Sequence, residues 1–274
     1  MGEILWDMLP GGKKAGGAPV NFAYHAGMNR VEAWAISALG NDDLGSELAE
    51  TARYNGIRLL AETVDYPTGT VQVELKGGIP NFIITEDVAW DHIPISIQTL
   101  SLVKRASAVS FGSLAQRSEC SRHTIQGLVK AAPAGSLKVF DINLRQNFYS
   151  KDIILESLEI CNVLKINDEE LAVVKKLFGL GGISDDEFCR SVIKRYGLKY
   201  LILTAGASHS TVYGSDCNSS TIPTPKTPVV DTVGAGDSFS GAFVAAILNG
   251  ASMEEAHQKA VDAATITCSH AGAW

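Results

Sequence analysis

The sequence predicts an α/β fold in which helices cover both faces of a central, mostly parallel β-sheet, with a small β-sheet as a lid. From about Ile93 onward, apolar runs of strand length alternate with segments of helical length, as in parallel strands joined by crossover helices. Between Thr68 and Thr85 the pattern instead alternates with period two around a Lys-Gly-Gly turn, which indicates a β-hairpin. The length of 274 residues fits one domain over residues 1–274.

The composition is that of a globular enzyme and argues against several classes of partner. Hydrophobic residues make up 46% of the chain, charged residues 19%, and the formal net charge is −7. Because duplex nucleic acid is bound by clustered Lys and Arg, we expect no nucleic-acid partner. No apolar run is long enough to span a bilayer, and the five scattered cysteines form no Cys-x-x-Cys pair, so we expect a cytoplasmic protein without a membrane partner.

The opening of the chain is expected to form part of the lid. Glu3–Leu9 is predicted as a strand that ends in a Pro-Gly-Gly turn, and a second glycine turn leads into a helix with Pro19 in its first turn. An isolated hairpin is marginal in water. We therefore expect the opening strand to join the hairpin, so that the lid comprises about residues 4–16 and 66–86.

The remaining elements follow from apolar periodicity and capping residues. The predicted strands are Val31–Leu39, Ala108–Phe111, Leu137–Asn143, Val163–Asn167 and Tyr200–Thr204. The predicted helices are Asp43–Asn55, Ile95–Lys104, Arg117–Ala131, Lys151–Cys161, Asp168–Phe178, a helix from Ser184 to Tyr196, and a last helix from Ser252 toward Thr267. Ser210–Gly214 is expected as an edge segment, and the Pro-rich Ile222–Pro228 as a loop.

The segment Asp231–Asp237 (DTVGAGD), directly before a long apolar helix, predicts an anion-binding site. The glycines let the backbone turn sharply, so the free amides of Gly234, Ala235 and Gly236 and the positive helix end converge on one point. A carboxylate beside such a site is a poor phosphate ligand but a suitable base for a hydroxyl that attacks a phosphate. The layout therefore indicates phosphoryl transfer to an alcohol, with Asp237 as the base.

Two other interpretations of this segment are open. The glycines could form an ordinary helix-start turn in which Asp237 only compensates the helix dipole. They could also, together with Gly241, belong to a dinucleotide-binding fingerprint. That fingerprint follows an early strand, whereas a Pro-rich loop precedes Asp231 here, so the context disfavours an NAD(P)-binding oxidoreductase.

Asp231–Phe239 (DTVGAGDSF) resembles the C-terminal signature of the ribokinase-like sugar kinases, the carbohydrate kinase family of phosphofructokinase B type. The resemblance implies a ribokinase-like fold, ATP as co-substrate and Mg²⁺. Family members usually have a longer first strand than this chain. The Gly-Gly-Ala-Pro turn near residue 17 resembles the family's N-terminal motif, and by this resemblance Asp7, Gly16, Gly17 and Asn21 contact the sugar.

Polar residues follow three predicted strands, and ligands of parallel sheets bind beyond these strand ends. Each could be turn chemistry, since Asn and Asp also favour turns and caps. The resemblance gives them roles. Asp141-x-Asn143-x-Arg145 resembles an element of fructokinases and 2-keto-3-deoxygluconate kinases that binds substrate. Further roles implied by the resemblance are Asn167, Thr204 and Gly206 for ATP and Glu170 for Mg²⁺ through water.

The family also implies a possible monovalent cation, K⁺, near the late motif. Its candidate ligands are Asp231, Val233, Thr267, His270 and Gly272. In the nucleotide loop His209 stands where the family usually has a second glycine.

These features together predict an ATP-dependent kinase acting on a primary hydroxyl of a ketose, with fructose giving fructose 6-phosphate. The alternative substrate is 2-keto-3-deoxygluconate or another sugar of the same family. A non-catalytic sugar or nucleotide sensor on the same scaffold is the alternative from a different class, and the acid at position 237 argues against it. The lid is the expected surface for a homodimer.

Overall fold

The computed structural model describes residues 1–9, 11–76 and 79–274. Its largest sheet has six strands in the order β12-β11-β10-β9-β8-β7, of which β7 to β10 are parallel and the last two antiparallel. The strands are β7 (Ala108–Gly112), β8 (Leu137–Asp141), β9 (Val163–Asn167), β10 (Tyr200–Ala205), β11 (His209–Gly214) and β12 (Ser219–Pro223). The prediction of a mostly parallel central sheet is confirmed.

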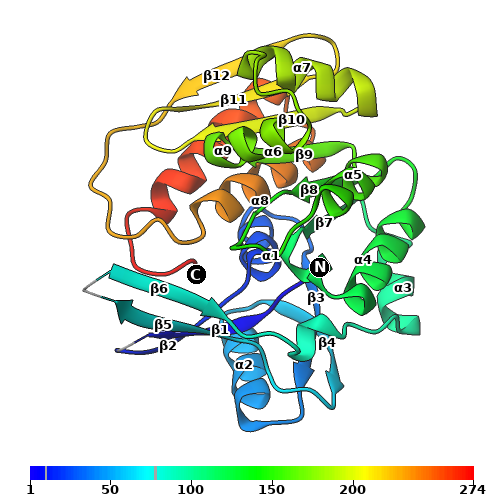
Figure 1. Cartoon of the computed structure of the whole chain (residues 1–274), viewed down its shortest axis with the longest axis vertical. Helices are drawn as coiled ribbons and strands as arrows, with labels where there is room; N and C mark the ends of the chain where they lie inside the picture. The colour runs from blue at the N-terminus through cyan, green and yellow to red at the C-terminus, as the bar shows by residue number, and fades with distance from the viewer. Residues whose placement is uncertain (10, 77–78) are drawn as a thin grey trace.

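Helices cover both faces of this sheet because successive strand residues are apolar on both sides. Phe140 and Leu164 face one hydrophobic cluster, and their neighbours Val139 and Val163 face the other. The first cluster is completed by α3 (Ile97–Val103), α4 (Glu119–Ala131), α5 (Lys151–Ile160), α6 (Asp168–Leu177) and α7 (Asp185–Tyr196). The second is completed by α1 (Ala18–Met28), α8 (Ala235–Leu248) and α9 (Met253–Thr267), which lie together on the other side of the sheet (Figure 1).

The first residues of the chain join the large sheet to a separate parallel pair. This pair consists of β3 (Trp34–Gly40) and β4 (Arg58–Val64), connected by α2 (Asp43–Tyr54). The amine of Met1 donates to the carbonyl of Ser110 in β7 at 2.7 Å, and the amide of Gly2 donates to the carbonyl of Ile36 in β3 at 3.0 Å. Residues 1–3 therefore run between the two sheets.

A separate four-stranded sheet, here called the small sheet, has the order β2-β1-β5-β6. It consists of β1 (Leu5–Leu9), β2 (Gly12–Gly16), β5 (Thr70–Lys76) and β6 (Ile79–Ile84), and lies at the lower left of Figure 1. The predicted pairing of the opening strand with the hairpin is present, because β1 runs parallel to β5 with Asp7 opposite Val71. The predicted turn at Gly77 and Gly78 lies outside the described residues.

Two expectations for the late strands are wrong. The segment from Ser210 is not at an edge, because β11 pairs with β10 on one side and β12 on the other. The start of the expected Pro-rich loop belongs to β12, whose last residue, Pro223, lies on the edge strand, where proline is tolerated. Among the described residues, no helix combines the length and apolar character needed to cross a membrane.

Candidate active site

The N-terminus of α8 presents backbone amides that have no hydrogen-bond acceptor in the described part of the chain. Gly234 caps the helix with φ 78°, and a Cβ at this position would lie 2.5 Å from the Cβ of Ala273. The amide of Ala235 donates to the carbonyl of Thr232 at 3.2 Å, so it is engaged in the turn and does not contribute the free amide expected of it. For the amides of Gly234, Gly236 and Asp237, the described residues provide no hydrogen-bond acceptor. These three donors match the anion-binding capacity of a helix N-terminus.

The carboxylate of Asp237 is held beside these amides by the amide side chain of Asn21. Nδ2 of Asn21 donates to Oδ2 of Asp237 at 2.8 Å, and Nε1 of Trp274 donates to Oδ1 of Asn21 at 2.7 Å. Because an indole N–H can only donate, it fixes which end of the Asn21 amide faces the carboxylate. Asn21, which was predicted as a sugar ligand, thus orients Asp237.

The environment of Asp237 makes it a stronger base than an exposed aspartate. Burial, and after it the nearby charge of Asp141, raise its pKa to about 6, although the Asn21 hydrogen bond and the charges of Lys165 and Arg145 oppose the shift. A base whose pKa lies close to neutral pH is well matched to proton transfer in the physiological range. Burial and repulsion by the carboxylate of Asp141 therefore raise the pKa of Asp237.

Lys165, in the middle of β9, is a site residue that sequence reasoning missed. Its side chain is 8% exposed, and Nζ lies 3.2 Å from Oδ1 of Asp141. A Cβ on Gly236 would approach Nζ to 3.1 Å, so the ammonium group lies next to this glycine. Burial lowers the pKa of Lys165, but the carboxylates of Asp141, Glu170 and Asp237 more than compensate and raise it. The sequence feature that could have indicated a role for Lys165 is that it is a single lysine within an apolar predicted strand.

Glu170 has a local structural role in addition to any role with a metal. Its Oε2 accepts from the amide of Asn167 at 2.9 Å, while the Asn167 side chain accepts from the amide of Glu170 at 2.8 Å, which is a capping box. Its Oε1 accepts from the amide of Leu144 at 3.0 Å and so fixes the loop after β8. Burial raises the pKa of Glu170, whereas Lys165 lowers it.

The residues present fit Mg²⁺ only as an ion that keeps most of its water. Among the described residues, no three His, Cys, Asp or Glu side chains are grouped to hold a metal directly. Each oxygen of Glu170 already accepts one backbone amide and retains one lone pair, which can accept a hydrogen bond from a metal-bound water.

The predicted sugar-contacting residues near the start of the chain lie beside one another. A Cβ on Gly16 would lie 3.1 Å from Oδ2 of Asp7, and Gly17, at φ 124°, leaves no room for a Cβ beside the carbonyl of Glu3. The described residues provide no hydrogen-bond donor to the carboxylate of Asp7, which is half-buried. Burial raises the pKa of Asp7, while Arg145 and Lys14 lower it.

The loop after β8 brings its polar residues toward the same carboxylates. Asn143 is buried and has a left-handed backbone with φ 44°. Arg145 is exposed, and its Nη1 donates only to the adjacent carbonyl of Leu144 at 3.0 Å among the described residues. Its positive charge opposes the rise in the pKa of Glu3, Asp7 and Asp237.

Glu3 is a second buried carboxyl group that the sequence did not reveal. It is 2% exposed, and its Oε2 has no hydrogen-bond partner in the described part of the chain. Burial raises its pKa to about 7, with a further contribution from the charge of Asp237. No motif surrounds Glu3 in the sequence, so nothing there indicated that its side chain is buried near Asp237.

Comparison with known proteins identifies the family to which this geometry belongs. The model of the pfkB family carbohydrate kinases matches residues 11–274. The chain belongs to the PfkB family of carbohydrate kinases.

Relatives agree with this assignment along nearly the whole chain. The uncharacterized sugar kinase PH1459 of Pyrococcus horikoshii is 27% identical over 244 residues, covering 86% of this chain and 74% of the relative. Fructokinase-1 of rice is 28% identical over 281 residues, covering 95% and 84%.

Two solved structures share the fold. That of PH1459 has a TM-score of 0.83 at 25% identity and covers 100% of this chain and 92% of the solved chain, and PH1459 was also solved with ATP. A fructokinase of Vibrio cholerae, solved with fructose, ADP and a potassium ion, has a TM-score of 0.80 at 21% identity and covers 99% and 92%. The predicted ribokinase-like fold is confirmed.

In this PfkB family chain, the predicted nucleotide residues lie at adjacent strand ends. Thr204 in β10 is opposite Asn167 in β9, next to the end of β8. Gly206 turns into β11 with φ 48°, and Oγ1 of Thr224 donates to its carbonyl at 2.9 Å. His209 begins β11, and its ring lies 2.9 Å from Oγ of Ser208. Three polar strand ends therefore meet at one edge of the sheet, as predicted.

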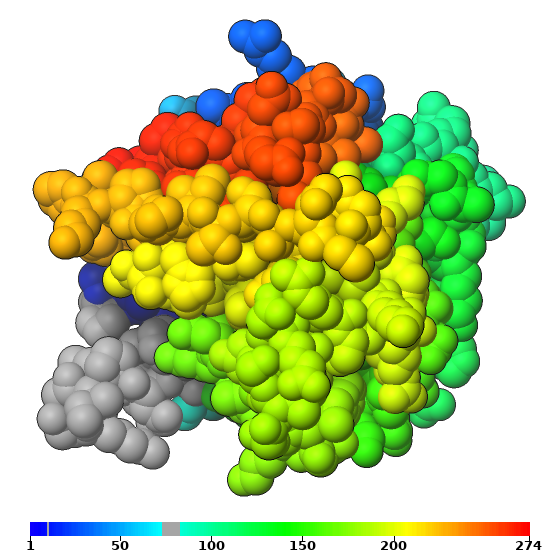
Figure 2. All heavy atoms as spheres, turned by 90° about the horizontal axis from the view of Figure 1, so that it is seen from above, coloured from blue at the N-terminus to red at the C-terminus, as the bar shows by residue number. Residues whose placement is uncertain are grey.

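The candidate cation ligands of this PfkB kinase are brought together by Asp231. Its Oδ1 accepts from the amide of Val233 and its Oδ2 from that of Gly272, each at 3.0 Å, and these two bonds lower its pKa. Figure 2 shows the segment after β12, in orange, running beside the C-terminal segment, in red. The amide of His270 reaches the carbonyl of Thr267 at 3.5 Å, so the loop after α9 folds back on itself.

Proposed function

We propose that this PfkB kinase transfers the γ-phosphate of ATP to a primary hydroxyl of a ketose, with fructose as the substrate and fructose 6-phosphate as the product. One observation carries the proposal: the carboxylate of Asp237 lies at the N-terminus of α8 beside amides that have no acceptor among the described residues, and the ammonium of Lys165 lies next to Gly236. Fructokinases among the relatives, at 27% to 29% identity, favour fructose.

The residues of the site divide the reaction between them. Asp237 takes the proton of the attacking hydroxyl, and Asn21 holds its carboxylate toward the site. The amides of Gly234 and Gly236 and the charge of Lys165 stabilise the negative charge on the transferred phosphoryl group. Mg²⁺, when bound, would neutralise the phosphates, with Glu170 and Asn167 holding its water ligands. Asp7 is left to accept hydrogen bonds from sugar hydroxyls.

A second substrate is favoured by Arg145. Its guanidinium group has no ion-pair partner among the described residues, and its charge acts on the carboxyl groups of Asp7 and Asp237. Such a group suits the carboxylate of 2-keto-3-deoxygluconate, because arginine can bind a carboxylate through two hydrogen bonds. A neutral ketose does not require it.

A coupled assay of ADP release across a panel of sugars and sugar acids tests the proposal. We expect sugar-dependent ADP release with fructose at a higher kcat/KM than with ribose or 2-keto-3-deoxygluconate. A preference for 2-keto-3-deoxygluconate that is lost in Arg145→Gln would support the second substrate instead. The absence of sugar-dependent ADP release across the panel, with ATP still bound, would favour a sensor.

We also propose that a monovalent cation, K⁺, binds between Asp231 and the loop after α9, through carbonyls near Val233, Thr267, His270 and Gly272. The backbone bonds that join Asp231 to Val233 and Gly272 support it, because they place these segments next to one another. Replacement of K⁺ by a bulky organic cation in the assay should then lower kcat. Equal rates in both salts would oppose the cation site.

A further inference from the structure

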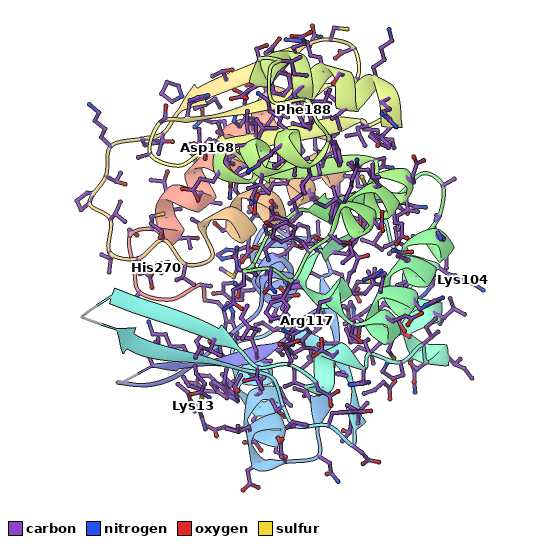
Figure 3. The ribbon with its side chains drawn as sticks, in the orientation of Figure 1. Lys13, Lys104, Arg117, Asp168, Phe188 and His270 are labelled. Atoms are coloured by element: carbon purple, nitrogen blue, oxygen red, sulfur yellow. The ribbon has the colours of Figure 1, made fainter. Side chains whose placement is uncertain are left out.

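Arg117 is a buried charge outside the motifs discussed above, and its side chain contacts several elements. It ends η2 (Leu114–Arg117), the 3-10 turn between β7 and α4, and its side chain is 7% exposed. Figure 3 labels it between the small sheet and the helices that cover the large sheet. Arg117 has no role in the proposed reaction. Burying a charged side chain costs free energy, so the position of Arg117 requires another explanation.

One end of its guanidinium group holds the base of the small sheet. Nη2 donates to the carbonyl of Thr85, directly after β6, at 2.6 Å. The amide of Thr85 in turn donates to the carbonyl of Thr70, the first residue of β5, at 3.1 Å, and their hydroxyl groups lie 3.0 Å apart. Arg117 therefore holds the start of β5 and the end of β6, which together form the base of the small sheet.

The same group is fixed by η1 (Ala89–Asp91). Nε and Nη2 donate to the two carboxylate oxygens of Asp91 at 2.9 and 2.8 Å, which is the paired geometry that arginine offers and lysine does not. The guanidinium carbon lies 4.0 Å from the ring centre of Trp90. That indole packs so closely on Gly69, before β5, that a Cβ there would lie 2.3 Å from Nε1.

Arg117 also contacts the loop that follows β8. Its guanidinium carbon lies 4.5 Å from the ring centre of Phe148, and the amide of Phe148 donates to the carbonyl of Arg145 at 3.0 Å. This loop carries Asn143 and Arg145. One side chain thus touches the base of the small sheet, which carries Asp7 on β1, and the loop that carries the other predicted sugar contacts.

We propose that Arg117 is a positioning residue for sugar binding: it fixes the base of the small sheet relative to the loop after β8 and thereby sets the spacing between Asp7 and the residues Asn143 and Arg145. The inference rests on the proposed sugar kinase function. A displacement of about 1 Å in a site of this kind can reduce the rate on the order of 10²-fold. The contacts of Arg117 within the described part of the chain, with Thr85, Trp90, Asp91 and Phe148, do not include β9, β10 or α8, which form the nucleotide end of the site.

The test compares Arg117→Lys with a substitution of another mostly buried cation that lies away from the small sheet. Lysine keeps the charge but cannot bond Asp91 with two nitrogens and Thr85 at once. The control is Lys175→Met, which removes the Lys175–Asp185 ion pair, 2.8 Å long, between α6 and the start of α7. All variants are assayed well below their melting temperatures, with KM measured separately for the sugar and for ATP.

We expect Arg117→Lys to raise the KM for the sugar about ten-fold, while the KM for ATP stays within about two-fold of the wild-type value. Phe148→Leu, which removes the ring from the loop, should raise the sugar KM in the same direction and serves if the lysine variant does not fold. Lys175→Met should lower the melting temperature without changing either KM. An unchanged KM for the sugar in both Arg117→Lys and Phe148→Leu would overturn the inference. Equal rises in the KM for the sugar and the KM for ATP would also overturn it.

The outcomes separate this inference from the function on which it rests. Wild-type enzyme without sugar-dependent ADP release would refute the sugar kinase function, whereas an active wild type with an unaltered Arg117→Lys sugar KM would refute only the positioning role. Hydrogen exchange provides a readout that needs no activity. The amides of Thr70 and Thr85 should exchange faster in Arg117→Lys than in Lys175→Met. Equal protection of these amides in both variants would contradict the positioning role of Arg117.

Discussion

At the residue scale, the site depends on a few positions where only one side chain fits. Gly234 combines a left-handed backbone with contact to Ala273, and Gly236 leaves space for the ammonium of Lys165. The sequence motif predicted the glycines and Asp237, because a helix start with free amides needs them. It did not reveal Lys165, Glu3 or the role of Asn21, because their meaning depends on partners far away in the chain.

Gly234→Ala should destabilise the protein by about 3 kcal/mol, because it adds backbone strain to a steric overlap with Ala273. Gly250→Ala is the matched control: Gly250 has a similar φ of 86°, but a Cβ added there would meet nothing within 4 Å. The control should lose only about 1 kcal/mol. Urea denaturation measures both, and equal losses would show that the contact with Ala273 contributes nothing.

The free energy of unfolding of the wild type should decrease as pH rises through 7, and this decrease should be absent in Glu3→Gln. The folded pKa of Glu3, about 7, lies above its ordinary value of 4.5, so its favourable contribution is complete below pH 4.5 and is lost as pH rises through 7. Between pH 5 and 8 the wild type should lose about 1–3 kcal/mol relative to the variant. Denaturation at both pH values measures this, with Glu50→Gln, an exposed position, as control. Parallel pH dependences for Glu3→Gln and wild type would contradict it.

At the scale of elements, apolar periodicity predicted the helices and strands that pack on the hydrophobic core, and it missed strands that depend on pairing with a neighbour. The helices and parallel strands from Ala108 to Ala205 were predictable because their apolar faces are continuous. β4 was missed because its residues are mostly half-buried and show no clear alternation, and β2 because glycine and lysine are poor strand formers. Both depend on pairing with a neighbouring strand.

The packing of α9 on the antiparallel edge of the sheet includes a buried histidine. His257 is fully buried, and its two ring nitrogens lie 2.8 and 2.9 Å from the hydroxyl oxygens of Ser210 in β11 and Ser220 in β12. Burial lowers its pKa to about 4. Since the unfolded chain binds the proton more readily, this group lowers stability as pH falls from about 6.5 to 4.

His257→Gln should therefore be less stable than the wild type at pH 7 but should lose less melting temperature on acidification to pH 4.5. Melting curves across this range measure the difference, and His123→Gln, at an exposed position of α4, serves as the control. A variant whose melting temperature falls in parallel with that of the wild type would show that His257 does not titrate with unfolding.

At the scale of the whole molecule, the site is assembled from distant parts of one chain. Trp274, at the end of the sequence, donates to Asn21 of α1, and Asn21 donates to Asp237 of α8. Lys165 of β9 lies next to Gly236 of the same helix. The family resemblance predicted which motifs belong to the site, because each motif has a recognisable local form. Their mutual contacts could not be predicted, since they arise only when α1 and α8 pack on the same face of the sheet.

The most direct test of the account is the kcat of Asp237→Asn in the ADP-release assay with saturating sugar and ATP. Asparagine keeps the size of the side chain but cannot accept the proton. If Asp237 is the base, kcat should fall on the order of 10²-fold or more, while ATP still raises the melting temperature of the variant. A kcat close to that of the wild type would contradict the proposed chemistry.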